Sequence, residues 1–207
     1  MKRFHDDFPA LLNGFNLETL ENDPNSIFGL SSDLTFNYLN PAWFNFSEEN
    51  EGEPAISERF GLGTHIGDAL SGTAREYYLD AFQRILQKGE VWHHDYECSS
   101  PTKFRLYHQS VYPLYKRSGL VVVNSLVTEQ PFDESVRISR PPIGKLYTQE
   151  TGFIVQCSNC RRVQCAPQQD VWDWVPAWIK HMPENTSHSI CPICFEYYYE
   201  CRYPRNK

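Results

Sequence analysis

The 207-residue sequence contains no run of about eighteen apolar residues, the length that a helix needs to cross a membrane. Its N-terminus places Asp6, Asp7 and Pro9 soon after two basic residues and lacks the apolar stretch of a secretory signal. We therefore expect a cytoplasmic protein with no membrane partner. Basic residues are also few, since 19 Lys and Arg stand against 26 Asp and Glu. This balance argues against nucleic acid as the main partner.

Motifs of well-known catalytic machinery are missing as well. The sequence has no phosphate-binding G-x-x-x-x-G-K-[ST] loop, no protein-kinase signature set and no G-x-S-x-G nucleophile elbow. We therefore expect a protein that is not an enzyme. The chain does have a hydrophobic content of 41% and an aromatic content of 14%, which is enough apolar material for a folded core.

The stretch from Gln130 to Gly144 divides the chain into two parts. It carries three prolines, several charges and no sustained hydrophobic periodicity, which is typical of an exposed connector. We expect four segments: an N-terminal helical extension (1–23), a first domain (24–130), a linker (131–144) and a C-terminal module (145–207).

The first domain shows alternating signals for strands and helices. Residues 26–40 predict a hairpin, and Asn40 followed by Pro41 predicts the cap and first turn of a short helix. Apolar residues at three- and four-residue spacing predict a helix over 71–88, ended by Gly89. Three strands should follow, over residues 91–98, 104–114 and 120–127. This order predicts an α+β fold, with a five-stranded antiparallel sheet and helices on one face.

Three stretches of this domain carry a family resemblance. They are the hairpin followed by YLNPAWFNFS, the helix REYYLDAFQRIL with GEVWHHDYE behind it, and the closing GLVVVNSLV. Together, over residues 24–130, they resemble a PAS domain. The resemblance implies a domain that senses a small ligand, redox state or light in a pocket between sheet and helices, or that serves only for dimerisation.

The strand that contains Trp92-His93-His94 bears on this pocket. Alternation along a strand sends the two histidines to opposite faces of the sheet, so one of them points toward the helices. We expect a pocket lined by aromatic and histidine side chains, namely Tyr77, Tyr78, Trp92, His94, Tyr96, Tyr107 and His108. The alternative is a filled core with hydrogen-bonded histidines and no ligand. The sequence leaves the ligand's identity open.

Six of the seven cysteines lie between residues 157 and 201, and four of them form two Cys-x-x-Cys pairs: Cys157 with Cys160, and Cys191 with Cys194. In a reducing compartment such pairs indicate a metal site more often than disulfides. Four thiolates complete a tetrahedron around zinc and keep no position open for water. The spacing therefore predicts structural zinc in a small metal-centred module.

Other residues of the module leave alternatives open. His188, three residues before Cys191, is an alternate ligand in place of one cysteine. Cys165 and Cys201 lie outside the paired spacing and should be packing residues or spare thiols. Three tryptophans between positions 172 and 178 should cover the metal-centred core or form a partner-binding surface.

The stretches FIVQCSNCRRVQ, WDWVPAWI and SHSICPICFEYYY resemble a small zinc-ribbon-like module at the C-terminus of bacterial signalling proteins. The whole sequence thus predicts a non-enzymatic sensory or signal-transduction protein. Its output would be a protein partner, or a homodimer through the apolar segment Phe4–Leu20.

Two other classes of function remain. In the first, the Cys-x-x-Cys pairs cycle chemically, as in a thiol redox switch or oxidoreductase. In the second, a zinc-containing transcription regulator binds DNA through basic residues, an interpretation that the acidic total opposes. These basic residues are Arg161, Arg162, Arg202, Arg205 and Lys207.

Overall fold

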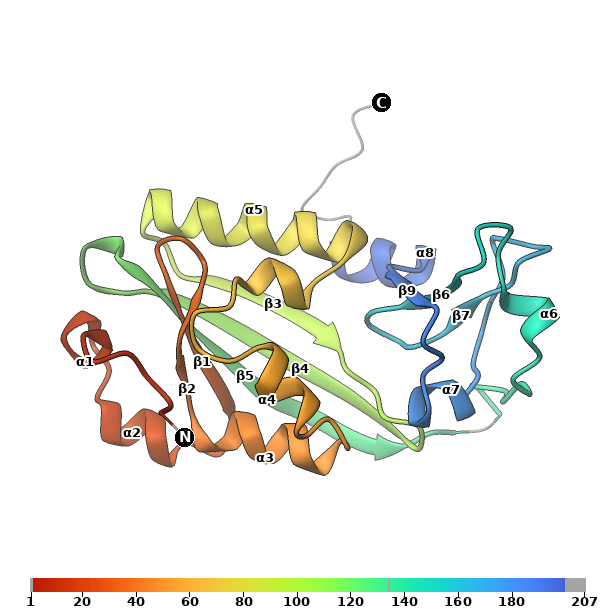
Figure 1. Ribbon diagram of the computed structural model, residues 1–207, viewed down its shortest axis with the longest axis horizontal. Helices are drawn as coiled ribbons and strands as arrows, with labels where there is room; N and C mark the ends of the chain where they lie inside the picture. Colours follow the sequence, from red (N-terminus) through yellow and green to blue (C-terminus); the bar gives the residue numbers. More distant parts are fainter. Residues whose placement is uncertain (1, 134, 200–207) are drawn as a thin grey trace. The chain divides into compact units, whose positions relative to one another are not determined.

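The computed structural model describes residues 2–133 and 135–199 (Figure 1). The described chain divides into two compact units. The first comprises the residues up to 70 together with 75–94 and 108–125, and the second comprises 71–74, 95–107 and those from 126 onward. The predicted segment boundaries at 23, 130 and 144 stay a prediction.

The elements of the first half follow the predicted order. The N-terminal residues form α1 (Phe8–Leu11) and α2 (Leu17–Asn22), and the hairpin consists of β1 (Ser26–Ser31) and β2 (Phe36–Leu39). Helical segments follow: α3 (Pro41–Glu49), α4 (Ala55–Arg59), the 3-10 turn η1 (Ile66–Ala69) and α5 (Gly72–Lys88). The remaining elements are β3 (Trp92–Glu97), β4 (Lys103–Pro113), the turn η2 (Tyr115–Arg117) and β5 (Gly119–Pro131).

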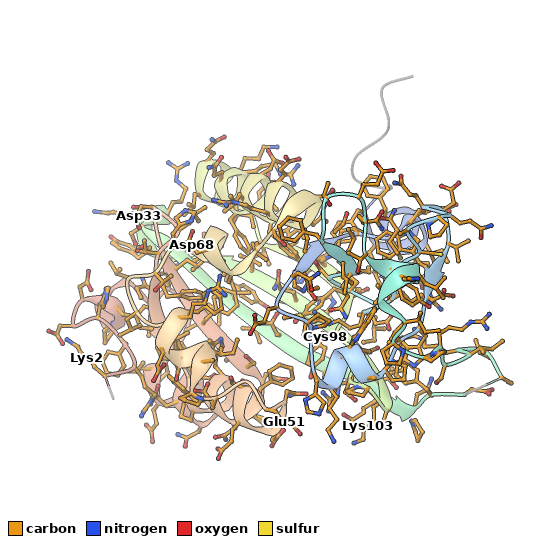
Figure 2. The ribbon with its side chains drawn as sticks, turned by 45° about the vertical axis from the view of Figure 1, so that its right-hand side comes forward. Lys2, Asp33, Glu51, Asp68, Cys98 and Lys103 are labelled. Carbon is orange, nitrogen blue, oxygen red and sulfur yellow. The ribbon has the colours of Figure 1, made fainter. Side chains whose placement is uncertain are left out.

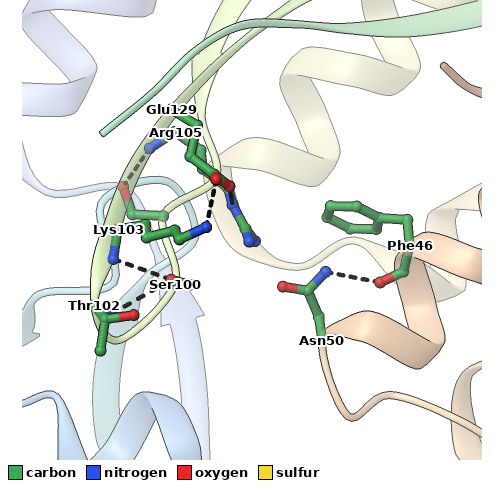
Figure 3. A network of polar contacts seen from close by, with 8 residues as sticks. Phe46, Asn50, Ser100, Thr102, Lys103, Arg105 and Glu129 are labelled. Atoms are coloured by element: carbon green, nitrogen blue, oxygen red, sulfur yellow. Dashed lines mark hydrogen bonds and ion pairs between the residues drawn. The ribbon is translucent and has the colours of Figure 1, made fainter. Parts of the chain in front are cut away.

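These strands form one five-stranded sheet in the order β2-β1-β5-β4-β3. The strand β1 pairs antiparallel with both β2 and β5, with Phe28 opposite Leu39 and Val122. The predicted α+β class with a five-stranded antiparallel sheet is confirmed. The strand β5 runs four residues further than the sequence indicated. At that end the Glu129 carboxylate accepts from Lys103 Nζ and, at 2.6 Å, from Arg105 Nε, both on β4 (Figure 3).

Alternation along β1 divides the core of the first unit into two. Phe28 and Leu30 join Phe82 and Ile85 of α5 on one face of the sheet. Ile27 points the other way and packs with residues of the N-terminal segment, where Phe8 stacks on Tyr38 at 4.6 Å between ring centroids. Phe8 of α1 and Leu20 of α2 are buried in this cluster, so both helices are part of this unit's core. Burying one such side chain stabilises a fold by about 1.5 to 3 kcal/mol.

Asn40 joins the start of β1 to the start of α3. Its side-chain oxygen accepts from the Trp43 N–H at 3.0 Å and from the Ile27 N–H at 2.9 Å. Its amide nitrogen donates to the Asn25 carbonyl at 2.9 Å, and the residue is fully buried. The predicted N-cap is therefore confirmed. The end of α5 also agrees with prediction, since Gly89 has a φ of +75° and donates to the Ile85 carbonyl.

The C-terminal part contains short elements around a second small sheet. They are α6 (Gly144–Tyr147), β6 (Ile154–Cys157), β7 (Val163–Gln164), β8 (Trp172–Asp173), α7 (Ala177–Lys180), β9 (Thr186–Ser189), α8 (Pro192–Cys194) and the π-helical turn η3 (Phe195–Tyr199). The sheet order is β8-β7-β6-β9, and β6 runs parallel to β9. Its apolar core includes Tyr147 and Val163, with Trp178 packed against it. Across the described residues, no helix combines the length and apolar character needed to cross a membrane.

Candidate metal centre

Parallel pairing of β6 and β9 brings the two Cys-x-x-Cys turns together. Cys157 is the last residue of β6 and lies opposite Ser189, the last residue of β9. Parallel strands end at the same edge of a sheet, so the turn after β6 and the turn after β9 leave from the same place. The Ser158 N–H donates to the Ser189 carbonyl at 2.8 Å, which ties the first turn to the second strand. We call Cys157–Cys160 the first knuckle and Cys191–Cys194 the second.

The four cysteine sulfurs form one compact group. They all lie within 4.8 Å of one another, and the Sγ atoms of Cys160 and Cys191 are 3.6 Å apart. Zinc–sulfur bonds of about 2.3 Å place the corners of a tetrahedron about 3.8 Å apart. All four residues are buried, with exposed fractions between 0% and 3%. The group can therefore bind a tetrahedral metal ion through four thiolates.

Backbone donors support negative charge on these sulfurs. The Cys191 N–H points to Cys157 Sγ at 3.3 Å, and the Cys194 N–H points to Cys191 Sγ at 3.4 Å. Hydrogen bonds among the four thiols hold the pKa of Cys157 far below its ordinary value and raise the pKa values of Cys160 and Cys194, so all four ionise only with a cation beside them. Four thiolates in one buried volume need a cation to balance them, and this donor set suits a soft metal ion.

The other predicted ligands and thiols lie outside this group. His188 sits on β9 opposite Gln156, and burial together with the Arg161 charge lowers its pKa. Its place as an alternate ligand stays a prediction. Cys98 and Cys165 are half-buried, and none of the described cysteines forms a disulfide. Cys201, Arg202, Arg205 and Lys207 lie outside the described residues.

Two contacts that the sequence did not predict hold the first knuckle from outside. The Tyr199 hydroxyl donates to Asn159 Oδ1 at 3.0 Å, and both residues are buried. Arg137 Nη1 donates to the Cys160 carbonyl at 3.4 Å. Neither Tyr199 nor Arg137 belongs to a recognisable spacing in the sequence. Their roles depend on tertiary contacts alone.

The tryptophans predicted to cover the module do so in part. Trp178 and Tyr147 pack edge to face with ring centroids 5.3 Å apart, and the buried Trp174 packs against Phe132 with ring centroids 4.7 Å apart. These contacts agree with a role in the core of the module. A role as a partner-binding surface is a separate matter and stays a prediction.

Four residues of the predicted pocket come together in the first unit. The Tyr77 hydroxyl and His94 Nδ1 are 3.2 Å apart, and both residues are buried. The Trp92 ring stacks on His94 at 5.4 Å, while Tyr78 meets His94 edge-on at 5.7 Å. As alternation predicted, His94 points inward and His93 is exposed. This arrangement packs the candidate pocket with rings that contact one another.

The other three predicted pocket residues are placed differently. Tyr96 and Tyr107 stack on each other at 5.6 Å in the second unit, and burial raises the pKa of Tyr96. His108 instead stacks on His93, with its Nε2 3.2 Å from His93 Nδ1. Since His93 and His94 point to opposite faces, His108 does not join the His94 cluster. The pocket as a binding site stays a prediction.

Sequence reasoning missed a buried polar pair in the first unit. Gln109 Nε2 donates to Asn124 Oδ1 at 2.9 Å, and Asn124 Nδ2 donates to the Ser26 carbonyl at 3.3 Å. Gln109 alternates with Val111, and Asn124 with Val122, both of which belong to the core that contains α5. The pair thus lies on the inner face of the sheet, beside the apolar residues of that core.

Comparisons with known proteins give structural neighbours only. No model of a known protein family matches the chain, and no curated protein matches it either. Among solved structures, a domain of an HTR-like protein from Haloarcula marismortui is 17% identical, with a TM-score of 0.37, and the match covers 51% of this chain and 100% of that one. The PAS domain of Bordetella pertussis BvgS is 17% identical, with a TM-score of 0.42, over 55% of this chain and 84% of that one.

A third neighbour is the PAS domain of nitrogen regulation protein NR(II) from Vibrio parahaemolyticus. It is 14% identical, with a TM-score of 0.32, and the match covers 56% of this chain and 95% of that domain.

Proposed function

We propose that this protein is a non-enzymatic sensory or signal-transduction protein. In this proposal a PAS-like domain passes its state to a C-terminal module built on structural zinc, which contacts a partner protein. The buried group of four cysteine sulfurs carries the proposal. A site closed by four thiolates keeps no coordination position for water or substrate, so it stabilises the module and does not hydrolyse.

The choice of zinc follows from the donor set. Four thiolates in a tetrahedron suit zinc, and iron is the other metal with this preference. Each thiolate must stay reduced and unprotonated to bind, so the proposal includes a reducing compartment such as the cytoplasm. The ion would be held by Cys157, Cys160, Cys191 and Cys194, and it would supply folding energy to the module.

For the PAS-like domain we propose ligand sensing or association with a second copy. The inward cluster around His94 supports either a small polar ligand or a packed core. The side chains proposed for association through Phe4–Leu20 include Phe8 and Leu20, which are buried against the sheet of their own chain. Deleting this segment would expose that sheet face, so the oligomeric state should be measured on the intact chain.

The experiment is elemental analysis and an absorption spectrum of the intact protein, purified without a metal-affinity step. We expect one zinc per chain and no visible absorption band. A visible band together with iron in the elemental analysis would identify the metal at this site as iron. A band from a bound ligand would favour ligand sensing. Light scattering on the same sample should show a dimer if the domain serves for association.

The redox alternative is separated by alkylation. In the zinc-loaded protein, Cys157 and Cys160 should react slowly with iodoacetamide until a chelator is added, because metal-bound thiolates are shielded. Rapid alkylation of either residue with zinc present would contradict the proposal and favour a thiol redox function.

A further inference from the structure

Arg137, in the connector before α6, contacts three side chains, which are those of Glu97, Phe132 and Trp174. Its Nη2 is 3.0 Å from Glu97 Oε1, and its guanidinium carbon lies 4.3 Å from the Phe132 ring centroid and 4.7 Å from that of Trp174. All four residues belong to the second unit. The side chains of Arg137 and Glu97 are only 10% and 7% exposed. The other described residues from 131 to 146, apart from Phe132, are exposed as the composition predicted.

A buried ion pair is costly to form, because both charges lose their hydration. Here further contacts offset part of that cost. The Ser99 hydroxyl donates to Glu97 Oε1 at 2.5 Å, and the two aromatic faces attract the guanidinium. Glu97 and Arg137 together carry no net charge, so the pair does not neutralise a zinc ion with four thiolates.

A second nitrogen of this guanidinium contacts the backbone of the candidate metal site. Arg137 Nη1 donates to the carbonyl of Cys160, a residue of the first knuckle. The planar fork of arginine thus holds a carboxylate with one nitrogen and a knuckle carbonyl with the other. Lysine has no such rigid two-ended geometry. The contact can therefore orient the knuckle without changing the charge at the sulfurs.

We propose that Arg137 is a positioning residue of the metal centre. It links the Cys160 carbonyl to Glu97 at the end of β3, so metal retention depends on the order of that strand end. Any event that displaces Glu97 removes the support of the first knuckle and speeds metal release. This inference rests on the proposed metal binding. Residues that orient metal ligands from outside commonly change metal affinity by about ten- to a hundred-fold when replaced.

The test measures the rate at which zinc passes from the intact, zinc-loaded protein to a chromogenic chelator. Arg137→Met keeps the aliphatic stem and removes the hydrogen bonds to Glu97 and to the Cys160 carbonyl. We therefore expect zinc release to become about ten- to a hundred-fold faster. Arg137→Lys should release zinc at a rate between those of Arg137→Met and the wild type. The control is Arg140→Met, because Arg140 lies in the same connector with a side chain 56% exposed and its nitrogen 3.8 Å from Asp173. It should release zinc at the wild-type rate.

A second variant separates positioning from a purely structural role. Glu97→Leu combined with Arg137→Met removes both charges and leaves no lone buried ion, a change that is often neutral or stabilising for a fold. We expect this double variant to stay folded at the assay temperature, as circular dichroism would show, but to release zinc as fast as Arg137→Met. Its cobalt-substituted form should show shifted d–d absorption bands, because the sulfur geometry has changed.

Wild-type release kinetics and a wild-type cobalt spectrum in the double variant would overturn the inference and leave the pair structural. Equal release from the wild type and Arg137→Met would overturn it as well. These outcomes leave the proposed function standing. A wild-type protein that holds no metal would instead overturn the proposed function itself, and that is measured before any variant is compared.

Discussion

Cys157 lies directly opposite Ser189 in the parallel ladder of β6 and β9. This register, and not the spacing along the chain, makes one site of two cysteine pairs separated by thirty residues. A shift by one residue would turn Cys157 to the other face of the sheet, because side chains alternate along a strand. The assembly of the four-cysteine group therefore depends on correct pairing of two four-residue strands.

The first prediction concerns the four sulfurs. Cys191→Ser should lose the metal and unfold the C-terminal module, because the binding free energy of a small metal-centred module is largely its folding free energy. Elemental analysis and circular dichroism melting would measure both effects. Cys165→Ser is the control, since Cys165 lies outside the sulfur group and should change neither. Full metal retention in Cys191→Ser would exclude the four-cysteine site and favour His188 as a ligand.

The second prediction concerns Asn40. Asn40→Ala should lower the free energy of unfolding by about 2 to 4 kcal/mol, because it removes a helix cap and leaves the buried Ile27 N–H without its acceptor. Urea denaturation would measure the change. Asn50→Ala is the matched control, because Asn50 Nδ2 donates to the Phe46 carbonyl at 2.7 Å on an exposed helix end (Figure 3). A loss no greater than that of Asn50→Ala would disprove the double role of Asn40.

The third prediction concerns the contact between Tyr77 and His94. Tyr77→Phe keeps the ring packing and removes the hydroxyl that bonds His94 Nδ1. We expect a loss of about 1 kcal/mol in the free energy of unfolding. Tyr115→Phe, at an exposed position, is the control and should have no measurable effect. If the two variants were equally stable, the hydrogen bond would add nothing to the core.

The fourth prediction concerns pH and the turn between β1 and β2, where Asp33 lies (Figure 2). Hydrogen bonds from the Ser31 and Thr35 hydroxyls hold the pKa of Asp33 below its ordinary value. A carboxylate with a lowered pKa in the folded state stabilises the fold above about pH 4, and this stabilisation is lost as the pH falls through the lowered value.

Asp33→Asn should therefore be less stable than the wild type at pH 7 and equal to it once the pH lies below the lowered pKa of Asp33. Urea midpoints of both proteins, measured from pH 7 downward, would show this difference in stability decrease to zero. Asp68→Asn, also at the surface, corrects for the loss of one charge. A stability difference that stays constant over the whole range would show that the charge of Asp33 plays no part in the turn.

Local patterns in the sequence were enough for the hairpin, the start of α3, the long helix α5 and the three strands after it, but they did not predict α4 or the full length of β5. The Asn40-Pro41 pair, the periodicity of 71–88 and the Gly89 terminator all act over a few residues, so they predict structure before any long-range contact exists. The Cys-x-x-Cys spacing likewise defines a two-thiolate chelate within a single turn. For these features the chain itself contains the geometric information.

Tertiary structure decided the features that depend on two distant segments. From the sequence, the apolar residues of α1 and α2 could equally have packed against a second copy of the chain. Only their contacts with Ile27 on one face of β1 show that they pack within their own chain. Arg137 stands in a proline-rich connector, and its partners Glu97 and Cys160 are forty and twenty-three residues away. Such contacts depend on loop closure and packing of the whole unit, and no local pattern encodes them.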